Sequence, residues 1–427
     1  MEDEKFDVII VGAGPAGSAC AYVLAREGKS VLMIERGDTA GSKNVTGGRL
    51  YTYALELVEP DLYKEALLER NVIREQIMLL SDKNGTTIDY FDGSAEEASM
   101  PQSYTILRAP FDEWFASKAE EQGAMLAAGI LVEELIEKDG KIVGVKAGGD
   151  EMYADLVIAA DGVNSTMARQ AGLKQEWNGH EVGVGVKEII ELDAKTIQDR
   201  FNVGAEEGAA RAILGGTAGV QGGGFLYTNK DSISLGIVLS PAALAAQKRS
   251  LADIYQDFKM HPAIYSLIKD GTTVEYSAHI VPENGWNSVP KKLYRDGFLM
   301  IGDAAGFVIN TGTMIRGIDL GIVSGVAAAR AIIAASKPDE VGPAYMQELE
   351  TLQLIPTMKL FSGWPQITSM ERMASTYPKM LNEMAAQMFF VDGKVPDRMD
   401  KAMRQILKKH VKISQLLADG WKGFRAI

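Results

Sequence analysis

The hydrophobic pattern from Phe6 to Glu35 predicts a strand, then a helix, then a second strand. Phe6 to Val11 is a short apolar run rich in β-branched residues, and Lys29 to Glu35 is a second one. Between them, after a glycine turn, Gly17 to Glu27 carries apolar residues at helical spacing. This pattern predicts a β–α–β unit at the N-terminus.

Hairpin patterns further along indicate a second sheet. Two β-like runs within Ile77 to Phe91 meet at Asn84-Gly85, the favoured two-residue hairpin turn, and Phe225 to Leu239 predicts another hairpin. Most of Gly183 to Ile280 is strand-like as well. Because such hairpins fit poorly in a parallel sheet, we expect these segments to form a separate, antiparallel domain.

Two later patterns return to the first sheet. Ile130 to Ile158 predicts a meander that ends in an apolar strand, and Gly297 to Gly302 predicts one more buried strand. The long apolar run Gly317 to Ser336 is rich in Gly and Ala and contains Asp319 and Arg330. This composition disfavours a membrane span and predicts a buried helix.

Together these patterns predict an α/β protein: a Rossmann-like domain, an inserted antiparallel β-sheet domain and a helical C-terminal region. The expected ranges are 1–75, 101–180 and 291–337 for the first domain, 76–100 and 181–290 for the second, and 338–427 for the helical region. The length of 427 residues suits two or three packed units.

Composition narrows the class of protein. Hydrophobic residues make up 46% and charged residues 24%, as in a soluble globular protein. The 44 Lys and Arg against 57 Asp and Glu give a net charge of −13, which argues against nucleic-acid binding. The single cysteine, Cys20, excludes an intrachain disulfide and any iron–sulfur or zinc site ligated only by cysteines of this chain.

The N-terminus lacks the pattern of a secretory signal. Met1 to Lys5 is charged and leads directly into the first strand. We expect a cytoplasmic protein, with peripheral attachment to the cytoplasmic face of the membrane left open.

A glycine motif in the first β–α turn predicts a dinucleotide site. Gly12, Gly14 and Gly17 form G-x-G-x-x-G, a triplet expected by chance about 0.4 times in so glycine-rich a chain. Here it joins a strand to a helix, and Glu35 ends the next strand where an acid would bind ribose hydroxyls. The helix N-terminus would face the phosphates. The predicted contacts are Gly12, Gly14, Ala16, Gly17, Glu35 and Arg36.

Two further acidic turns favour FAD over NAD. Asp161-Gly162 and Gly302-Asp303 both follow apolar strands, and the second precedes the long Gly/Ala helix. A carboxylate there can bind ribityl hydroxyls, and the helix N-terminus would face the pyrimidine end of the flavin, where negative charge gathers on reduction. Each aspartate taken alone is equally compatible with a helix cap or an Asx turn.

The ordered motifs resemble a known flavoprotein group. That group includes aromatic hydroxylases, geranylgeranyl reductases and electron-transfer-flavoprotein:quinone oxidoreductases. Over nearly the full length, the chain resembles the FixC branch of the last family. The segments that carry the resemblance are Gly41 to Arg49, Gly183 to Glu188, Gly222 to Asn229 and Gly302 to Asp319.

The resemblance implies a glutathione-reductase-type FAD domain and further site residues. It places Lys43, Asn44, Val45 and Gly48 along the flavin. Gly312 and Arg316 would lie near its pyrimidine edge, and Arg108 would border the FAD. No side-chain nucleophile, catalytic triad or metal-ligand pattern is recognisable in the sequence, and we expect the flavin to carry the chemistry.

The resemblance also implies partners. The donor would be an electron-transfer flavoprotein of two subunits, and the acceptor a membrane quinone. Mitochondrial relatives carry a [4Fe–4S] domain that one cysteine cannot form, so a separate ferredoxin-like iron–sulfur subunit is implied. Two alternatives stay open: an NAD(P)H-dependent isoprenoid or polyketide reductase or hydroxylase on the same fold, and a flavin-bearing subunit without a redox role.

The C-terminus differs in charge from the rest of the chain. Asp392 to Ile427 holds 9 Lys and Arg against 4 Asp and Glu, which leaves 35 against 53 upstream. Basic residues at helical spacing there suit a solvated face, a docking site for an acidic ferredoxin-like partner, or contact with an anionic membrane. The residues concerned are Lys401, Arg404, Lys408, Lys409 and Lys412.

Overall fold

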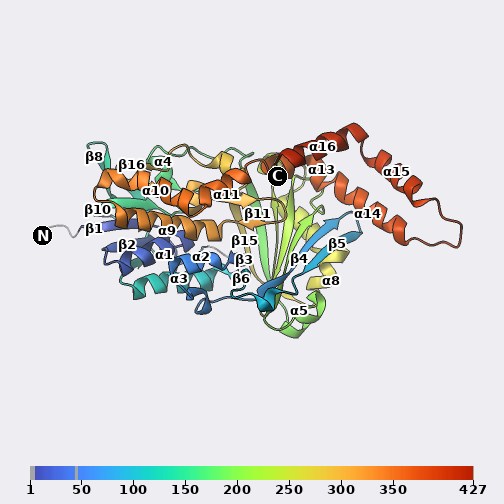
Figure 1. The fold of residues 1–427 in the computed structure, drawn as a ribbon, viewed down its shortest axis with the longest axis horizontal. Helices are drawn as coiled ribbons and strands as arrows, with labels where there is room; N and C mark the ends of the chain where they lie inside the picture. Colours follow the sequence, from blue (N-terminus) through green and yellow to red (C-terminus); the bar gives the residue numbers. More distant parts are fainter. Residues whose placement is uncertain (1–4, 44–46, 427) are drawn as a thin grey trace.

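The computed structural model describes residues 5–43 and 47–426. Figure 1 shows a parallel-sheet unit at the N-terminal end, a large second sheet in the middle, and C-terminal helices, some of which project beyond the second sheet. The α/β class and the helical C-terminal region predicted from the sequence are confirmed.

The first sheet has eight strands and contains the predicted β–α–β unit. Its main path is β16-β17-β10-β1-β2-β7, and β17, β10, β1, β2 and β7 run parallel. The strands are β1 (Phe6–Val11), β2 (Val31–Glu35), β7 (Met125–Ala128), β8 (Val132–Lys138), β9 (Lys141–Ala147), β10 (Asp150–Ala159), β16 (Tyr294–Arg295) and β17 (Phe298–Met300). The meander β8–β9–β10 matches the predicted one, because β9 pairs antiparallel with both of its neighbours.

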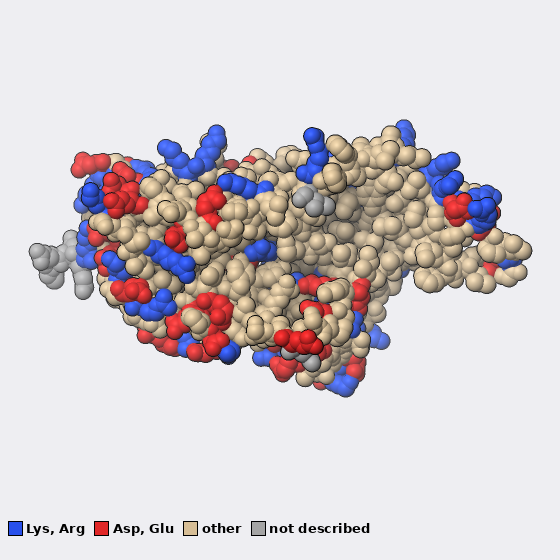
Figure 2. All heavy atoms as spheres, in the orientation of Figure 1, with Lys and Arg blue, Asp and Glu red and all other residues tan. Residues whose placement is uncertain are grey.

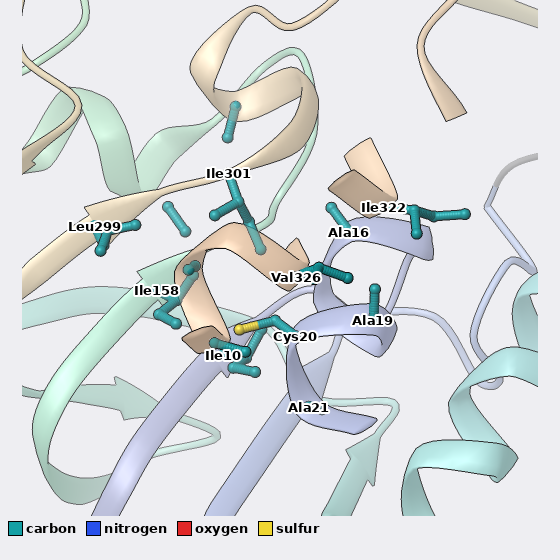
Figure 3. Close-up of a cluster of buried hydrophobic side chains, with 14 of the residues drawn as sticks. Ile10, Ala16, Ala19, Cys20, Ala21, Ile158, Leu299, Ile301, Ile322 and Val326 are labelled. Atoms are coloured by element: carbon teal, nitrogen blue, oxygen red, sulfur yellow. The ribbon is translucent and has the colours of Figure 1, made fainter. Parts of the chain in front are cut away.

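Close packing of two helices covers the centre of this sheet. The helices of the unit are α1 (Pro15–Arg26), α2 (Tyr53–Val58), α3 (Arg108–Glu121), α4 (Thr166–Gln170), α9 (Ile318–Ala334) and α10 (Val341–Thr351). Helix α9 is the predicted buried helix, and it packs on α1. Figure 3 shows that the contact is built from small residues such as Ala16, Ala19 and Cys20, with Ile10 and Ile158 beneath them. Cys20 is fully buried, and burial raises the pKa of its thiol.

The second sheet has nine strands, eight of them in the order β15-β11-β14-β13-β12-β4-β6-β3, with β5 paired to β4. The strands are β3 (Gly47–Tyr51), β4 (Asn71–Leu80), β5 (Gly85–Phe91), β6 (Ser103–Leu107), β11 (Val182–Glu191), β12 (Glu207–Leu214), β13 (Gly222–Thr228), β14 (Ser232–Leu239) and β15 (Thr272–Pro282). Both predicted hairpins are confirmed: Leu80 pairs with Gly85, and Thr228 with Ile233.

One face of the second sheet is covered by helices. Helices α5 (Ala194–Phe201), α7 (Leu251–Lys259) and α8 (Pro262–Ile268) pack on it, and α6 (Pro241–Ala245) lies beside β11. Val186, Leu235 and Ile237 point into this core together with Phe258 of α7. Because side chains alternate along a strand, the neighbouring residues of β11 and β14 face the other way, toward the first unit.

Three strands pair in a different sheet from the one that the domain ranges expected from the sequence imply. β3, β6 and the first half of β4 lie in ranges expected in the first domain, yet all pair within the second sheet. The second sheet is also not wholly antiparallel, because β12 and β4 run parallel. A period-two apolar pattern identifies a strand but not its partner, which explains both differences.

The C-terminal region ends in an arm of three helices. After α11 (Leu354–Leu360), α12 (Pro365–Thr368) and α13 (Glu371–Ala374) come α14 (Thr376–Phe389), α15 (Met399–His410) and α16 (Ile413–Ala426). We call residues 376–426 the C-terminal arm; Figure 1 shows α14 and α15 projecting beyond the second sheet. Within the described ranges, no helix combines the length and hydropathy needed to cross a bilayer.

Candidate flavin site

The β1–α1 turn has the geometry that its glycines predict. Gly12 has φ +106°, and a Cβ there would overlap the carbonyl oxygen of Ala160. A Cβ at Gly17 would overlap the carbonyl oxygen of Gly12. At Gly14, the N-cap of α1, a Cβ would meet no other described atom within 4 Å. The turn is therefore tight on the protein side and open at Gly14, where the first N–H groups of α1 lack intrahelical partners.

The carboxylate of Glu35 is held against this turn. Its Oε2 accepts a hydrogen bond from the Ala13 N–H at 3.1 Å, and its Oε1 accepts one from the Gly37 N–H at 2.8 Å. These bonds fix the acid at the end of β2 beside the open helix terminus. Arg36, next along the chain, is exposed.

Asp161 combines a capping bond with a free acceptor. Its Oδ2 accepts a hydrogen bond from the Met167 N–H at 3.2 Å, in the first turn of α4. Its Oδ1 is buried and has no hydrogen-bond partner among the described residues. Burial raises the pKa of this carboxyl. Gly162 follows with φ +77°.

Gly302 and Asp303 lie directly against the first turn. Gly302 has φ +58°, its N–H donates to the Ser324 hydroxyl at 2.8 Å, and a Cβ there would be 2.9 Å from Cβ of Ala16. Burial raises the pKa of Asp303, while the cations Arg108, Lys174 and Lys187 oppose the rise. The strand ends of β1, β10 and β17 thus meet around one site, as the order of motifs predicts.

A lysine that the sequence did not single out joins two of these loops. The Nζ of Lys174 donates to the carbonyl oxygens of Val163 at 3.2 Å and Ala304 at 3.1 Å. Trp177 donates its indole N–H to the same Val163 carbonyl at 2.8 Å and lies 4.2 Å from the ammonium. Burial lowers the pKa of Lys174 to about 8. No sequence motif marks this residue, since its partners are backbone atoms.

Arg108 is positioned by its own helix. Its Nε and Nη2 donate to the two carboxylate oxygens of Asp112 at 2.9 and 2.7 Å. Asp112 is fully buried at the start of α3, so the guanidinium is held at a defined place near Asp303.

The residues implied by the family resemblance are only partly placed. Lys43 is exposed, while Asn44 and Val45 lie outside the described residues. Gly48 lies in β3, where a Cβ would be 2.9 Å from Cδ1 of Ile318 at the start of α9. The N-terminal end of β3 therefore lies close to the start of α9.

Gly312 and Arg316 lie on a small hairpin, β18 (Ile309–Asn310) and β19 (Ile315–Arg316). Gly312 has φ +80°, and its N–H donates to Oδ1 of Asn310 at 2.7 Å. Arg316 donates to the carboxylate of Asp319 at 2.8 Å and to the Tyr53 hydroxyl at 2.7 Å. The Arg316 guanidinium is therefore part of a buried hydrogen-bond network at the start of α9.

The sheet face opposite this site carries side chains that the sequence analysis missed. Phe225 and Tyr227 stack with ring centroids 5.3 Å apart, and Lys187 and His279 lie on neighbouring strands. Burial and nearby cations lower the pKa of His279 to about 4. Glu283 accepts a hydrogen bond from Asn310 at 2.7 Å, and burial raises its pKa to about 7. In the sequence, only the alternation of apolar and polar residues around Lys187 could have indicated that this face of the sheet lines the site.

The residues present fit FAD. Space at Gly14 suits a pyrophosphate, and Glu35 suits a ribose. The carboxylate of Asp303 suits a hydroxyl donor, as does the buried Oδ1 of Asp161, which has no hydrogen-bond partner among the described residues. A bound flavin supplies two-electron transfer. The protein would contribute orientation and the cations Arg108, Lys174 and Lys187, which act on Asp303. This architecture defines an FAD-dependent oxidoreductase.

Comparisons with known proteins agree with this class and narrow it. The family model described as FAD binding domain matches residues 5–340, and the one described as ETF-QO/FixC family C-terminal domain matches residues 364–427. Protein FixC of Escherichia coli K12 is 45% identical over 99% of both chains. A probable electron transfer flavoprotein-quinone oxidoreductase of the same organism, YdiS, is 44% identical over 100% of both. The chain belongs to the FixC family of flavoprotein oxidoreductases.

Solved structures share the fold at lower identity. A geranylgeranyl bacteriochlorophyll reductase-like protein from Thermoplasma acidophilum has a TM-score of 0.71 at 23% identity, covering 97% of this chain and 99% of that one. A flavin-dependent brominase has a TM-score of 0.65 at 16% identity, covering 99% and 98%. These likenesses bear on the fold alone.

Proposed function

We propose that this protein accepts electrons from a two-subunit electron-transfer flavoprotein and passes them to a membrane quinone. The observation that carries the proposal is the full-length match to a relative named as a probable electron transfer flavoprotein-quinone oxidoreductase. With Cys20 as its one cysteine, buried in α1, the chain depends on a separate ferredoxin-like subunit for any cysteine-ligated iron–sulfur cluster.

The proposed cofactor contacts follow the geometry above. The dinucleotide part of FAD is held by Gly12, Gly14, Ala16, Gly17, Glu35 and Arg36. The middle of the cofactor is held by Asp161, Gly162, Gly302, Asp303 and Arg108. The flavin ring is bordered by Lys43, Asn44, Val45, Gly48, Gly312 and Arg316. The parallel unit is then of the glutathione-reductase type, and the nine-stranded sheet is an inserted substrate domain. The stacked pair Phe225 and Tyr227 offers flat apolar surface to a quinone ring.

The choice of electron donor tests this function. We expect reduced electron-transfer flavoprotein to reduce the bound FAD rapidly, and NADH or NADPH to reduce it slower by orders of magnitude. The chain has a second glycine-rich segment, Gly215 to Gly224, but this segment leads into strand β13 and offers no helix N-terminus for a second dinucleotide. Stopped-flow flavin bleaching with each donor gives the comparison. Fast reduction by NADPH alone would favour the reductase or hydroxylase alternative, and a flavin that no donor reduces would favour the non-redox alternative.

The C-terminal arm supports membrane contact, though at different residues from the basic stripe expected from sequence. Lys409 pairs with Glu383 at 2.7 Å and Lys401 with Asp397 at 3.0 Å, so part of that stripe is neutralised. The last residue of α14 and the loop that follows it instead expose apolar side chains: Phe389 is 81% exposed, Phe390 64% and Val391 88%. Burying one such side chain is worth about 1.5–3 kcal/mol.

Helix α16 adds an apolar stripe of the kind found in interfacial helices. Ile413, Leu417, Trp421 and Phe424 recur at spacings of four, four and three, and all are exposed. Figure 2 shows a largely uncharged surface on the arm between charged side chains at its edge and tip. We propose that this surface rests on the anionic membrane that holds the quinone, with the net positive charge of the C-terminus adding salt-dependent attraction.

Liposome flotation tests the membrane contact. The double substitution Phe389→Ser, Phe390→Ser should lower binding to vesicles containing anionic phosphatidylserine by tenfold or more, since each Phe contributes about 1.5 kcal/mol or more. Leu131→Ser, at a position 58% exposed in the first unit, is the matched control and should float like wild type. Unchanged flotation of the double variant would exclude this contact. If that variant also loses a co-purifying iron–sulfur subunit, the loop is a protein-docking site.

A further inference from the structure

Lys187 projects from the second sheet toward the flavin site. Its neighbours on β11, Val186 and Glu188, face the helix-covered side, where Glu188 forms an ion pair with Lys259 of α7 at 2.5 Å. Strand alternation therefore directs Lys187 to the opposite face. That is the face on which Phe225 and Tyr227 lie.

The residues around Lys187 leave its ammonium group open. In the strand register it lies beside Gly236 of β14 and Ser277 of β15, and Gly185 precedes it on the same face. The ring of Phe225 is the nearby aromatic surface, with its centroid 5.8 Å from Nζ. Among the described residues, no carboxylate lies within ion-pair distance of Lys187. Its positive charge is therefore available to a ligand between the two units.

The charged groups that face Lys187 come from three elements. Arg108 at the start of α3 repels it and Asp303 after β17 attracts it. His279 on β15 is kept neutral mainly by burial, and also by the charges of Lys187 and Arg108, which together lower its pKa to about 4. Arg108 is already neutralised by Asp112, whereas Lys187 has no such partner among the residues that the structure describes. Burial, with the repulsion from Arg108, lowers the pKa of Lys187 to about 8.

We propose that Lys187 is a flavin-facing cation supplied by the second sheet, which favours the reduced, negatively charged cofactor over the oxidised one. A cation that is fixed in a site with little water stabilises negative charge that develops on a neighbouring group, because the cation is already in place and need not move. This role concerns the established FAD cofactor and does not depend on which donor or acceptor the protein uses.

The midpoint potential of the bound FAD tests the proposal. We expect Lys187→Met to make binding of reduced FAD at least tenfold weaker relative to oxidised FAD, equivalent to a potential lower by about 30 mV for a two-electron couple. Lys187→Arg should keep the potential near that of wild type. Lys230→Met, at the exposed β13–β14 turn, is the matched control and should leave the potential unchanged.

The pH dependence gives a second readout. The ammonium is charged below its pKa of about 8, so the difference in potential between wild type and Lys187→Met should be full below pH 7 and shrink as the pH rises past 8. A potential unchanged in Lys187→Met would overturn the proposal. So would equal weakening of oxidised and reduced FAD, since Lys187 would then be a general binding residue.

Discussion

Replacing Gly14 by Val is expected to abolish FAD retention while leaving the protein folded. A Cβ at this position meets no described protein atom within 4 Å, so the protein itself leaves room for the start of a side chain there. It would occupy the space of the pyrophosphate and break hydrogen bonds to charge, each worth about 1.5–3 kcal/mol. Loss of two such bonds raises the dissociation constant of FAD about 100-fold or more.

Flavin content after gel filtration, together with titration of FAD into the apoprotein, measures this effect. Gly420→Val in α16 is the matched control, because its Cβ also meets no atom within 4 Å. Glu35→Ala should be milder, since it removes ribose contacts and leaves the pyrophosphate site intact. Equal FAD content in Gly14→Val and wild type would show that the β1–α1 turn is not the cofactor site.

Replacing Gly325 by Ala is expected to destabilise the fold itself. A Cβ at this position in α9 would overlap the carbonyl oxygen of Ala16 in α1, and the helix backbones would have to separate. Overpacking of this kind typically costs about 1–3 kcal/mol, more than the roughly 1 kcal/mol that Ala gains over Gly in a helix. We expect a net loss of up to about 2 kcal/mol in the free energy of unfolding.

The same substitution one turn earlier provides the control. A Cβ at Gly321 would lie 3.6 Å from Cβ of Ala16, an ordinary contact. Gly321→Ala should therefore be neutral or stabilise by up to about 1 kcal/mol. Urea unfolding of both apoproteins makes the comparison, and equal stability of the two variants would mean that α1 and α9 are not packed as closely as described.

Features that depend on local chemistry could be predicted from the sequence. The β1–α1 turn was predictable because Gly12 and Gly17 occupy positions that tolerate no side chain, and such needs select glycine at fixed spacing. The hairpin at Asn84-Gly85 was predictable because turn geometry restricts residue type. Asp161 shows the limit of this reasoning: both the capping role and a free acceptor oxygen are present, and no pattern separates them.

Contacts between segments far apart in the sequence could be read only from the folded structure. The strands β3 and β6 pair within the second sheet. The sequence could not predict this, because an alternating apolar pattern does not identify the partner strand. Lys174 donates hydrogen bonds to backbone carbonyls in the loops after β10 and β17. Because every residue has a backbone carbonyl, no sequence motif identifies these partners. Lys187 faces the flavin site only because β11 is covered by helices on its other side. Contacts between residues far apart in sequence depend on how the layers pack, and that information lies in the whole chain and in no single segment.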